Sequence, residues 1–212
     1  MDGRKGIAVR VPKELRKYLH RKKVGWNIWI QWVLATTLGG AVGYAVGFFL
    51  TIAVYDAVYD AVGTAVANSV AFLLLGAVAG VGLGLTQWLV LRKRLSQTHW
   101  WILATTVGAA VGVSVFFAVG SAVVSAVDFL LFGTVVGGAL GLTQWLVLRK
   151  RLSQTPWWIL ATSLGGAVGG AVGFAVDDIV ALAVSFAVAG TISGAITGAA
   201  LVWLLRQNAR GI

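Results

Sequence analysis

Polar side chains that could do chemistry in this chain are few, and they recur at corresponding places in long apolar stretches. Hydroxyl residues stand in adjacent pairs, and two identical Thr-Gln-Trp segments contribute amides. In an apolar environment such groups either hydrogen-bond neighbouring helices, at about 1 kcal/mol each or less, or line a polar vestibule. A vestibule of three like units would be incomplete, because Ala200 and Leu201 replace Thr143 and Gln144 in the last copy. The residues concerned are Thr36, Thr37, Gln87, Thr105, Thr106, Gln144, Thr162 and Ser163.

Few side chains in this chain could carry out acid–base or metal chemistry. The chain has no cysteine and two histidines, which excludes thiolate sites and argues against a histidine metal cluster. Asp128 is the candidate proton site, since a carboxylate within a bilayer marks such sites. Its place near the outer end of a stretch also suits an interfacial residue that ends a helix. We therefore expect a non-enzymatic protein with no metal and no cofactor.

Composition assigns the chain to a membrane. Of its 212 residues, 58% are hydrophobic and 11% are charged, and the mean hydropathy is +0.87. A soluble domain carries about 25% charged residues, so this chain lacks the polar side chains to cover itself in water. Its apolar runs are too long for strands and do not alternate, which argues against a β-barrel. The expected fold class is an all-α integral membrane protein.

Six apolar stretches succeed one another, and each is about the 20 residues that a helix needs to cross a bilayer. With six spans, all 17 Lys and Arg residues lie on one side, and the opposite loops hold aspartates alone. The positive-inside rule then places both termini in the cytoplasm. The predicted spans are about 27–53, 63–90, 99–119, 124–148, 156–175 and 180–204.

Basic residues gather at the predicted cytoplasmic face. Residues 1–25 form a basic tail, either an amphipathic helix attracted to anionic lipid or a solvated topogenic segment. Nucleic acid is not expected as a partner, because aromatic residues do not interleave with these charges. Two further clusters are predicted to contact anionic lipid headgroups, namely Arg92, Lys93, Arg94, Arg149, Lys150 and Arg151.

Tryptophan has the same one-sided distribution. All ten tryptophans fall near the cytoplasmic ends of predicted spans. Indole rings prefer the headgroup level, where the ring is sheltered and the N–H reaches water. We expect a belt of interface anchors made of Trp26, Trp29, Trp32, Trp88, Trp100, Trp101, Trp145, Trp157, Trp158 and Trp203.

An internal repeat divides the chain into three units. The segment Thr86–Thr98 recurs unchanged at Thr143–Thr155, 57 residues later, and a decayed third copy ends at Arg206. Each unit returns the chain to the same side of the membrane, so the repeats are parallel. We predict three tandem helix pairs, about 26–91, 99–148 and 156–205, in a transmembrane domain 26–205 followed by a cytoplasmic tail 206–212.

Glycine stripes run along the predicted helices. A glycine at every fourth position lets another backbone approach closely. Antiparallel pairing aligns Gly39 with Gly84 and Gly43 with Gly80, so we expect the stripes to pack the two helices of each pair together. The predicted helix-packing residues are Gly39, Gly43, Gly47, Gly76, Gly80, Gly84, Gly108, Gly112, Gly133, Gly137, Gly141, Gly165, Gly169, Gly173, Gly190, Gly194 and Gly198.

The repeated Gly-x-x-Gln-Trp-Leu-Val-Leu-Arg pattern, at Gly84–Arg92 and Gly141–Arg149, resembles one in uncharacterised multi-pass membrane proteins of cyanobacteria and related bacteria. The resemblance covers most of 26–205. It implies a bacterial inner or thylakoid membrane and brings no activity with it. Six spans in three pairs are also similar to mitochondrial carriers, but the signature prolines and charged gates of those proteins are absent here.

Two functional classes remain open. The first expectation is a structural or interaction role (scaffold or assembly), because no charged residue is predicted deep in the spans. The alternative is a passive channel or small-solute transporter with a path along the pseudo-threefold axis of the three helix pairs. Expected partners are anionic lipid headgroups, together with a membrane protein or a second copy of the chain.

Overall fold

Every described element is an α-helix, as the sequence predicts. The computed structural model describes residues 13–95, 99–119, 125–150, 152, 155–177 and 182–208, and no strand occurs among them. Residues 1–12 of the predicted basic tail, Arg151 and residues 209–212 lie outside these ranges. The helices are α1 (Lys13–Val62), α2 (Thr64–Leu91), α3 (Trp100–Ala118), α4 (Ala126–Leu148), α5 (Pro156–Asp177) and α6 (Leu182–Asn208).

Within the described ranges, five helices are long and apolar enough to cross a membrane. They are Gly25–Ala61 within α1, α2, α3, Val127–Leu148 of α4 and Val184–Asn208 of α6. Helix α5 is not among these five.

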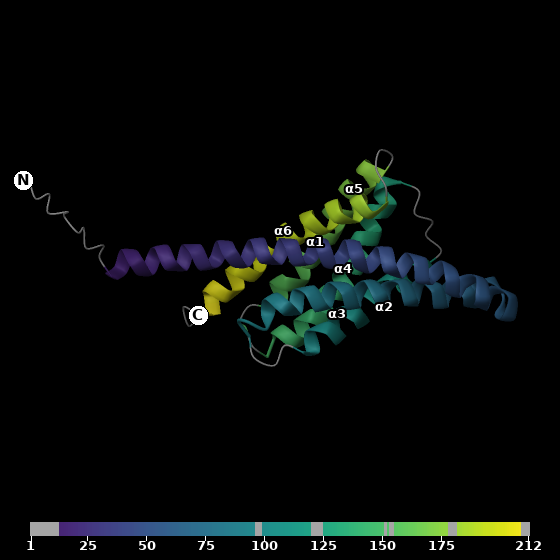
Figure 1. Ribbon diagram of the computed structural model, residues 1–212, viewed down its shortest axis with the longest axis horizontal. Helices are drawn as coiled ribbons and strands as arrows, with labels where there is room; N and C mark the ends of the chain where they lie inside the picture. Colours follow the sequence, from purple (N-terminus) through teal and green to yellow (C-terminus); the bar gives the residue numbers. More distant parts are fainter. Residues whose placement is uncertain are drawn as a thin grey trace, which may run out of the picture.

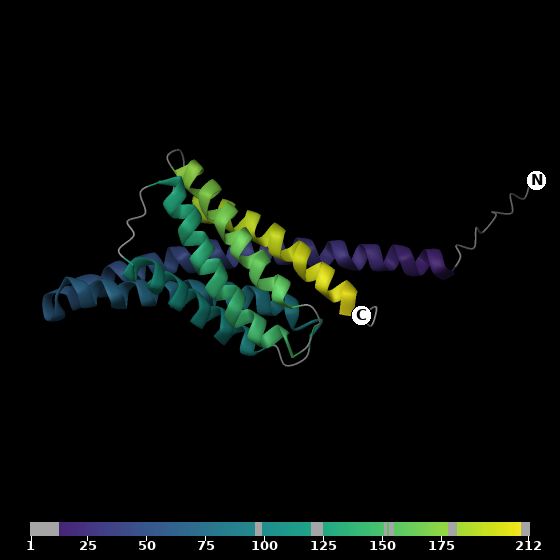
Figure 2. The same cartoon turned by 180° about the vertical axis from the view of Figure 1, so that it is seen from behind.

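The first predicted pair, 26–91, is longer than the pairs 99–148 and 156–205, and helix α1 contributes much of the difference. It has 50 residues, which corresponds to about 75 Å at 1.5 Å per residue. It begins at Lys13, inside the segment expected as a tail, and passes through Tyr55 and Asp56 without a break. The helix stops where Gly63 adopts a φ of 79°, a left-handed conformation that glycine allows after a helix end. Figures 1 and 2 show α1 and α2 running on beyond the other helices at this end.

The six helices form a closed ring in chain order. Each helix packs against its neighbours in sequence, and α6 packs back against α1. Among the described residues, only neighbouring helices have backbones in close contact, and non-neighbouring helices meet through side chains. Because consecutive helices alternate in direction, the start of α1, α3 and α5 and the end of α2, α4 and α6 share one end of the ring. We call it the basic end, because Arg92, Arg149 and Arg206 lie there.

The glycine stripes of the first helices face the second helix of the same pair. A Cβ built on Gly43 would lie 2.9 Å from the carbonyl oxygen of Ala79, and one on Gly112 would lie 2.8 Å from the Cα of Val136. Real side chains essentially never make such contacts with backbone. Glycine at these positions therefore allows the two backbones of a pair to approach closely.

The stripes of the second helices face a different neighbour, and the pairing of Gly43 with Gly80 is wrong. Gly80 lies against α3, where an added Cβ would be 2.6 Å from the Cα of Thr106. Gly137 likewise lies against Thr162 of α5, and Gly190 against Thr37 of α1. A helix in a ring has two neighbours, and the stripe of each second helix meets the next pair along the chain. The last stripe meets α1, which closes the ring.

Candidate functional site

Three tryptophans meet on the ring axis near the basic end. Trp32 of α1, Trp101 of α3 and Trp158 of α5 are each 0% exposed. Their ring centroids lie 5.8 to 5.9 Å apart, and each ring meets the other two edge to face. Edge-to-face contact is a favourable arrangement of aromatic rings. We call these residues the indole triangle.

Each indole N–H of the triangle donates to the second helix of the preceding pair. Trp101 Nε1 donates to Gln87 Oε1 at 3.1 Å, and Trp158 Nε1 donates to Gln144 Oε1 at 3.0 Å. Trp32 Nε1 donates to Thr197 Oγ1 of α6 at 2.9 Å. The hydrogen bonds therefore join all three pairs around the ring.

The two glutamines also bind the first helix of their own pair. Gln87 Nε2 donates to Thr36 Oγ1 at 3.1 Å, and Gln144 Nε2 donates to Thr105 Oγ1 at 3.0 Å. A further contact of 3.4 Å joins Gln144 Nε2 to Gln87 Oε1. Both amides are almost fully buried, with 4% and 2% exposure. Buried polar groups that all have partners favour one arrangement of the helices.

The third pair departs from this pattern at Leu201. Leu201 stands 57 residues after Gln144 and cannot accept from the indole of Trp32. Thr197, one helical turn earlier, accepts instead. Thr162 Oγ1 donates to the carbonyls of Trp158 and Ile159 in its own helix, as Thr105 Oγ1 donates to the carbonyl of Trp101.

Aliphatic side chains seal the ring around the triangle. The buried cluster that contains the three indoles also holds Ile28, Leu91, Leu148, Leu152, Leu201 and Leu204. Side chains therefore fill the centre of the ring at its basic end.

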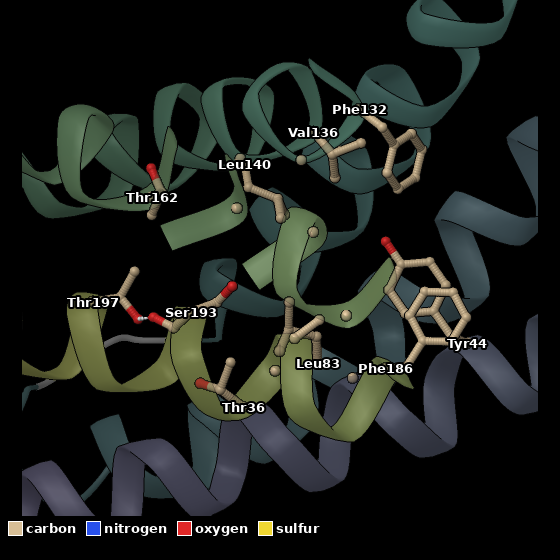
Figure 3. Close-up of a pocket in the computed structure, with 18 of the residues that line it drawn as sticks. Thr36, Tyr44, Leu83, Phe132, Val136, Leu140, Thr162, Phe186, Ser193 and Thr197 are labelled. Atoms are coloured by element: carbon tan, nitrogen blue, oxygen red, sulfur yellow. Dashed lines mark hydrogen bonds between the residues drawn. The ribbon is translucent and has the colours of Figure 1, made fainter. Parts of the chain in front are cut away.

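A cavity of about 190 Å³ lies next to the triangle, away from the basic end. Its walls come from α1, α2, α4, α5 and α6. At one end lie Gln144, Trp158 and Thr197, and toward the other Tyr44 and Phe186 stack with ring centroids 4.2 Å apart. Figure 3 shows these aromatic rings and the hydroxyl residues at opposite ends of the space.

Gly40 gives independent evidence for this cavity. It is buried in α1, yet a Cβ built on it would meet no atom within 4 Å. A buried position with nothing beside it faces unoccupied interior space. In the same region α5 presents Gly166, Gly170 and Gly173, whereas the corresponding positions of α3 hold buried side chains, namely Ala109, Val113 and Phe116.

The predicted polar residues divide into two groups. Thr36, Gln87, Thr105, Gln144 and Thr162 are buried in or beside the network described above. Their partners in the adjacent hydroxyl pairs, Thr37, Thr106 and Ser163, do not line the cavity. Thr37 instead shares a hydrogen bond of 3.0 Å with Thr191, and Thr106 donates to the carbonyl of its own Ile102.

The expectation that every tryptophan anchors at the interface is wrong for the indole triangle. Trp100 and Trp157 are 57% and 59% exposed, while the next residues, Trp101 and Trp158, are completely buried. Sequence reasoning also missed Tyr44, Ser193 and Thr197. For the indole triangle the sequence does contain a signal: one tryptophan recurs four residues before each of Thr36, Thr105 and Thr162.

Charged residues lie away from the cavity. Arg92 stacks over Trp88 and Arg149 over Trp145, each at 5.0 Å from the ring centroid, and Lys93, Arg94 and Lys150 are exposed. At the opposite end, Asp128 begins α4 instead of ending a helix. Ser125 caps that helix, and its hydroxyl donates to Asp128 Oδ2 at 2.7 Å. No cluster of metal-binding side chains occurs among the described residues.

Comparisons with known protein families, with curated proteins and with solved structures find no match.

Proposed function

We propose that the chain is an integral membrane protein whose six helices all cross the bilayer, as three tandem parallel pairs. The distribution of side chains supports this. Leu34, Leu38 and Val42 point outward and are 54% to 60% exposed, whereas the amides of Gln87 and Gln144 are buried inside. Apolar residues outside and hydrogen-bonded polar groups inside suit a protein surrounded by lipid.

The positive-inside rule supports a cytoplasmic location for the basic end. The resemblance of the repeated Gly-x-x-Gln-Trp-Leu-Val-Leu-Arg pattern to bacterial proteins supports an inner or thylakoid membrane. Arginine over tryptophan at Arg92 and Arg149 suits the headgroup level, where indole and guanidinium both find polar partners. Anionic lipid is the partner that this basic surface favours. The glycines between the helices serve as packing positions, as the close backbone contacts at Gly43 and Gly80 indicate.

The function that the geometry supports best is passive, non-enzymatic passage of a small neutral solute through the ring. One observation carries this proposal: a central cavity of about 190 Å³ that ends on the indole triangle. Its lining of hydroxyl, amide and apolar groups suits neutral molecules. In this arrangement the triangle closes the path, and passage requires the three indoles to separate.

A structural or interaction role, the first expectation from the sequence, is the second candidate. The filled centre at the basic end favours it, because a ring that stays closed serves only to pack against lipid and partners. The two candidates predict different solute permeabilities once the triangle is opened.

Flux measurements on proteoliposomes test the proposal. Glycerol entry is followed by stopped-flow light scattering for wild type, for Trp101→Ala, and for Trp100→Ala as the matched control on the outer surface. Passage predicts that Trp101→Ala raises the glycerol permeability at least tenfold, while Trp100→Ala leaves it unchanged. Each variant is first checked for wild-type helicity by circular dichroism. Equal permeability of the two folded variants would overturn passage and leave the structural role.

A further inference from the structure

Three hydroxyl groups beside the indole triangle already donate their hydrogens within the protein. Ser193 Oγ donates to the carbonyl of Gly165 at 2.7 Å, and Thr197 Oγ1 donates to the carbonyl of Ser193 at the same distance. Thr162 Oγ1 donates within α5. These three oxygens can still accept, since a hydroxyl has one hydrogen and two lone pairs.

Ser193 is the best placed of the three acceptors. Thr197 Oγ1 already accepts from Trp32 Nε1, and Thr162 Oγ1 packs against Gly141 of α4. Ser193 lines the cavity, and Figure 3 shows its side chain between Thr162 and Thr36 on the wall formed by α6. A guest in the cavity therefore meets an oxygen that accepts a hydrogen bond.

Most of the remaining wall is apolar, and the polar side chains in it are the neutral ones of Thr36, Tyr44, Gln87, Gln144 and Ser185. Leu83, Phe132, Val136, Leu140 and Phe186 contribute side chains, and several glycines contribute backbone. Among the described residues, no Lys, Arg, Asp or Glu lines the cavity. A charged guest would lose its hydration without gaining a counter-charge, so the site favours an uncharged molecule with an apolar body.

The volume of the cavity suits a small guest. An apolar cavity of about 150 Å³ takes up benzene, and the cavity here measures about 190 Å³. We propose that it binds a small uncharged molecule that combines an apolar body with one hydrogen-bond donor, the class of phenols and short-chain alcohols. This inference specifies the solute of the passage proposed above. Binding itself does not require the indole triangle to open.

Equilibrium dialysis of radiolabelled phenol and benzene against the purified full chain in detergent tests the inference. The two probes share a body, and only phenol carries a donor. Gly40→Leu places a side chain in the empty space beside α1. Any probe that still associates with this variant measures non-specific partitioning into the detergent micelle. Val42→Leu enlarges a residue on the outward face of the same helix and is the matched control. Ser193→Ala removes the acceptor and keeps the cavity.

The expected result is saturable binding of both probes to wild type and to Val42→Leu, with phenol bound about tenfold more tightly than benzene. Gly40→Leu should abolish saturable binding of both. Ser193→Ala should remove most of the tenfold preference and leave benzene binding unchanged. Hydrogen-bond energies of about 1 kcal/mol correspond to a preference of this order.

Three results would overturn the inference: no saturable binding to wild type, equal affinity for the two probes, or unchanged binding in a folded Gly40→Leu variant. These outcomes are separate from the flux result. Binding without flux in Trp101→Ala would refute passage and keep the site. Flux without phenol binding would refute the ligand class and keep passage.

Discussion

Replacing Gln144 with leucine would impose on the second pair the residue that the third pair carries at Leu201. The change removes the acceptor of Trp158 Nε1 at 3.0 Å and the donor to Thr105 Oγ1 at the same distance. The contact of 3.4 Å with Gln87 is also lost, but it lies beyond the usual range of a hydrogen bond. Trp158 is 0% exposed, so its N–H would remain buried without a partner.

The cost of the substitution can be worked out from these contacts. Hydrogen bonds between membrane helices contribute about 0.6 kcal/mol on average, and a stranded buried donor costs about 1–3 kcal/mol. We expect Gln144→Leu to lower the free energy of unfolding by about 2 kcal/mol. Removing both partners of a buried hydrogen bond destabilises a protein less than leaving one of them without a partner. Adding Trp158→Phe should therefore cost about 1 kcal/mol less in the double variant than the sum of the two single changes.

Equilibrium unfolding in mixed micelles, titrated with sodium dodecyl sulfate and followed by far-ultraviolet circular dichroism, measures these quantities. Helicity is a better probe than fluorescence because the chain holds ten tryptophans. Trp157→Phe, on a residue that is 59% exposed, provides the matched control and should combine additively with Gln144→Leu. The reasoning fails if Gln144→Leu unfolds within about 0.5 kcal/mol of wild type, a difference typical of surface substitutions, or if the Trp158 cycle is also additive.

Two further predictions concern the ring and its orientation. Gly80→Ala should lower the free energy of unfolding by about 1–3 kcal/mol, since the new Cβ meets backbone at 2.6 Å and overpacking has costs of this size. Gly138→Ala, whose Cβ would have its nearest contact at 3.4 Å, should be neutral in the same titration, and equal effects would contradict the packing described above. For orientation, single cysteines at Lys93→Cys and Asp60→Cys should react with a membrane-impermeant maleimide from opposite sides of sealed vesicles. Reaction of both from one side would refute the topology.

Much of the helical layout could be predicted from the sequence, because long apolar stretches separated by charged segments have few other solutions in lipid. The positions of Gln87 and Gln144 inside the protein were predictable for the same reason: an amide at membrane depth needs a partner. Only the identity of that partner was missing. The tryptophans illustrate why, since Trp100 and Trp101 differ by one residue and hence by about 100° around the helix. Depth along the helix is readable from the sequence, but direction around it depends on which neighbours surround the helix.

The glycine stripes show the same limit more clearly. The residue numbers fit one antiparallel register that pairs Gly39 with Gly84. For two helices considered alone, packing one glycine stripe against the other is the arrangement to expect. In a ring each helix has a second neighbour, and the stripe through Gly84 packs against Ile102 of α3. Local spacing identifies a surface suited to close contact without identifying its partner. The cavity was equally hidden, because a buried glycine with empty space beside it, such as Gly40, has the same sequence signature as one in tight contact.

The closed ring has the connectivity of a cyclic trimer joined into one chain. The face that each second helix presents to the next pair is the same kind of face three times over, and the contact of α6 with α1 returns it to the start. Head-to-tail contacts of this kind terminate only when the rotation closes. A chain that lacked one pair would therefore expose two complementary faces at its ends. Such truncated chains would join one another, whereas in this chain α6 and α1 cover each other's faces.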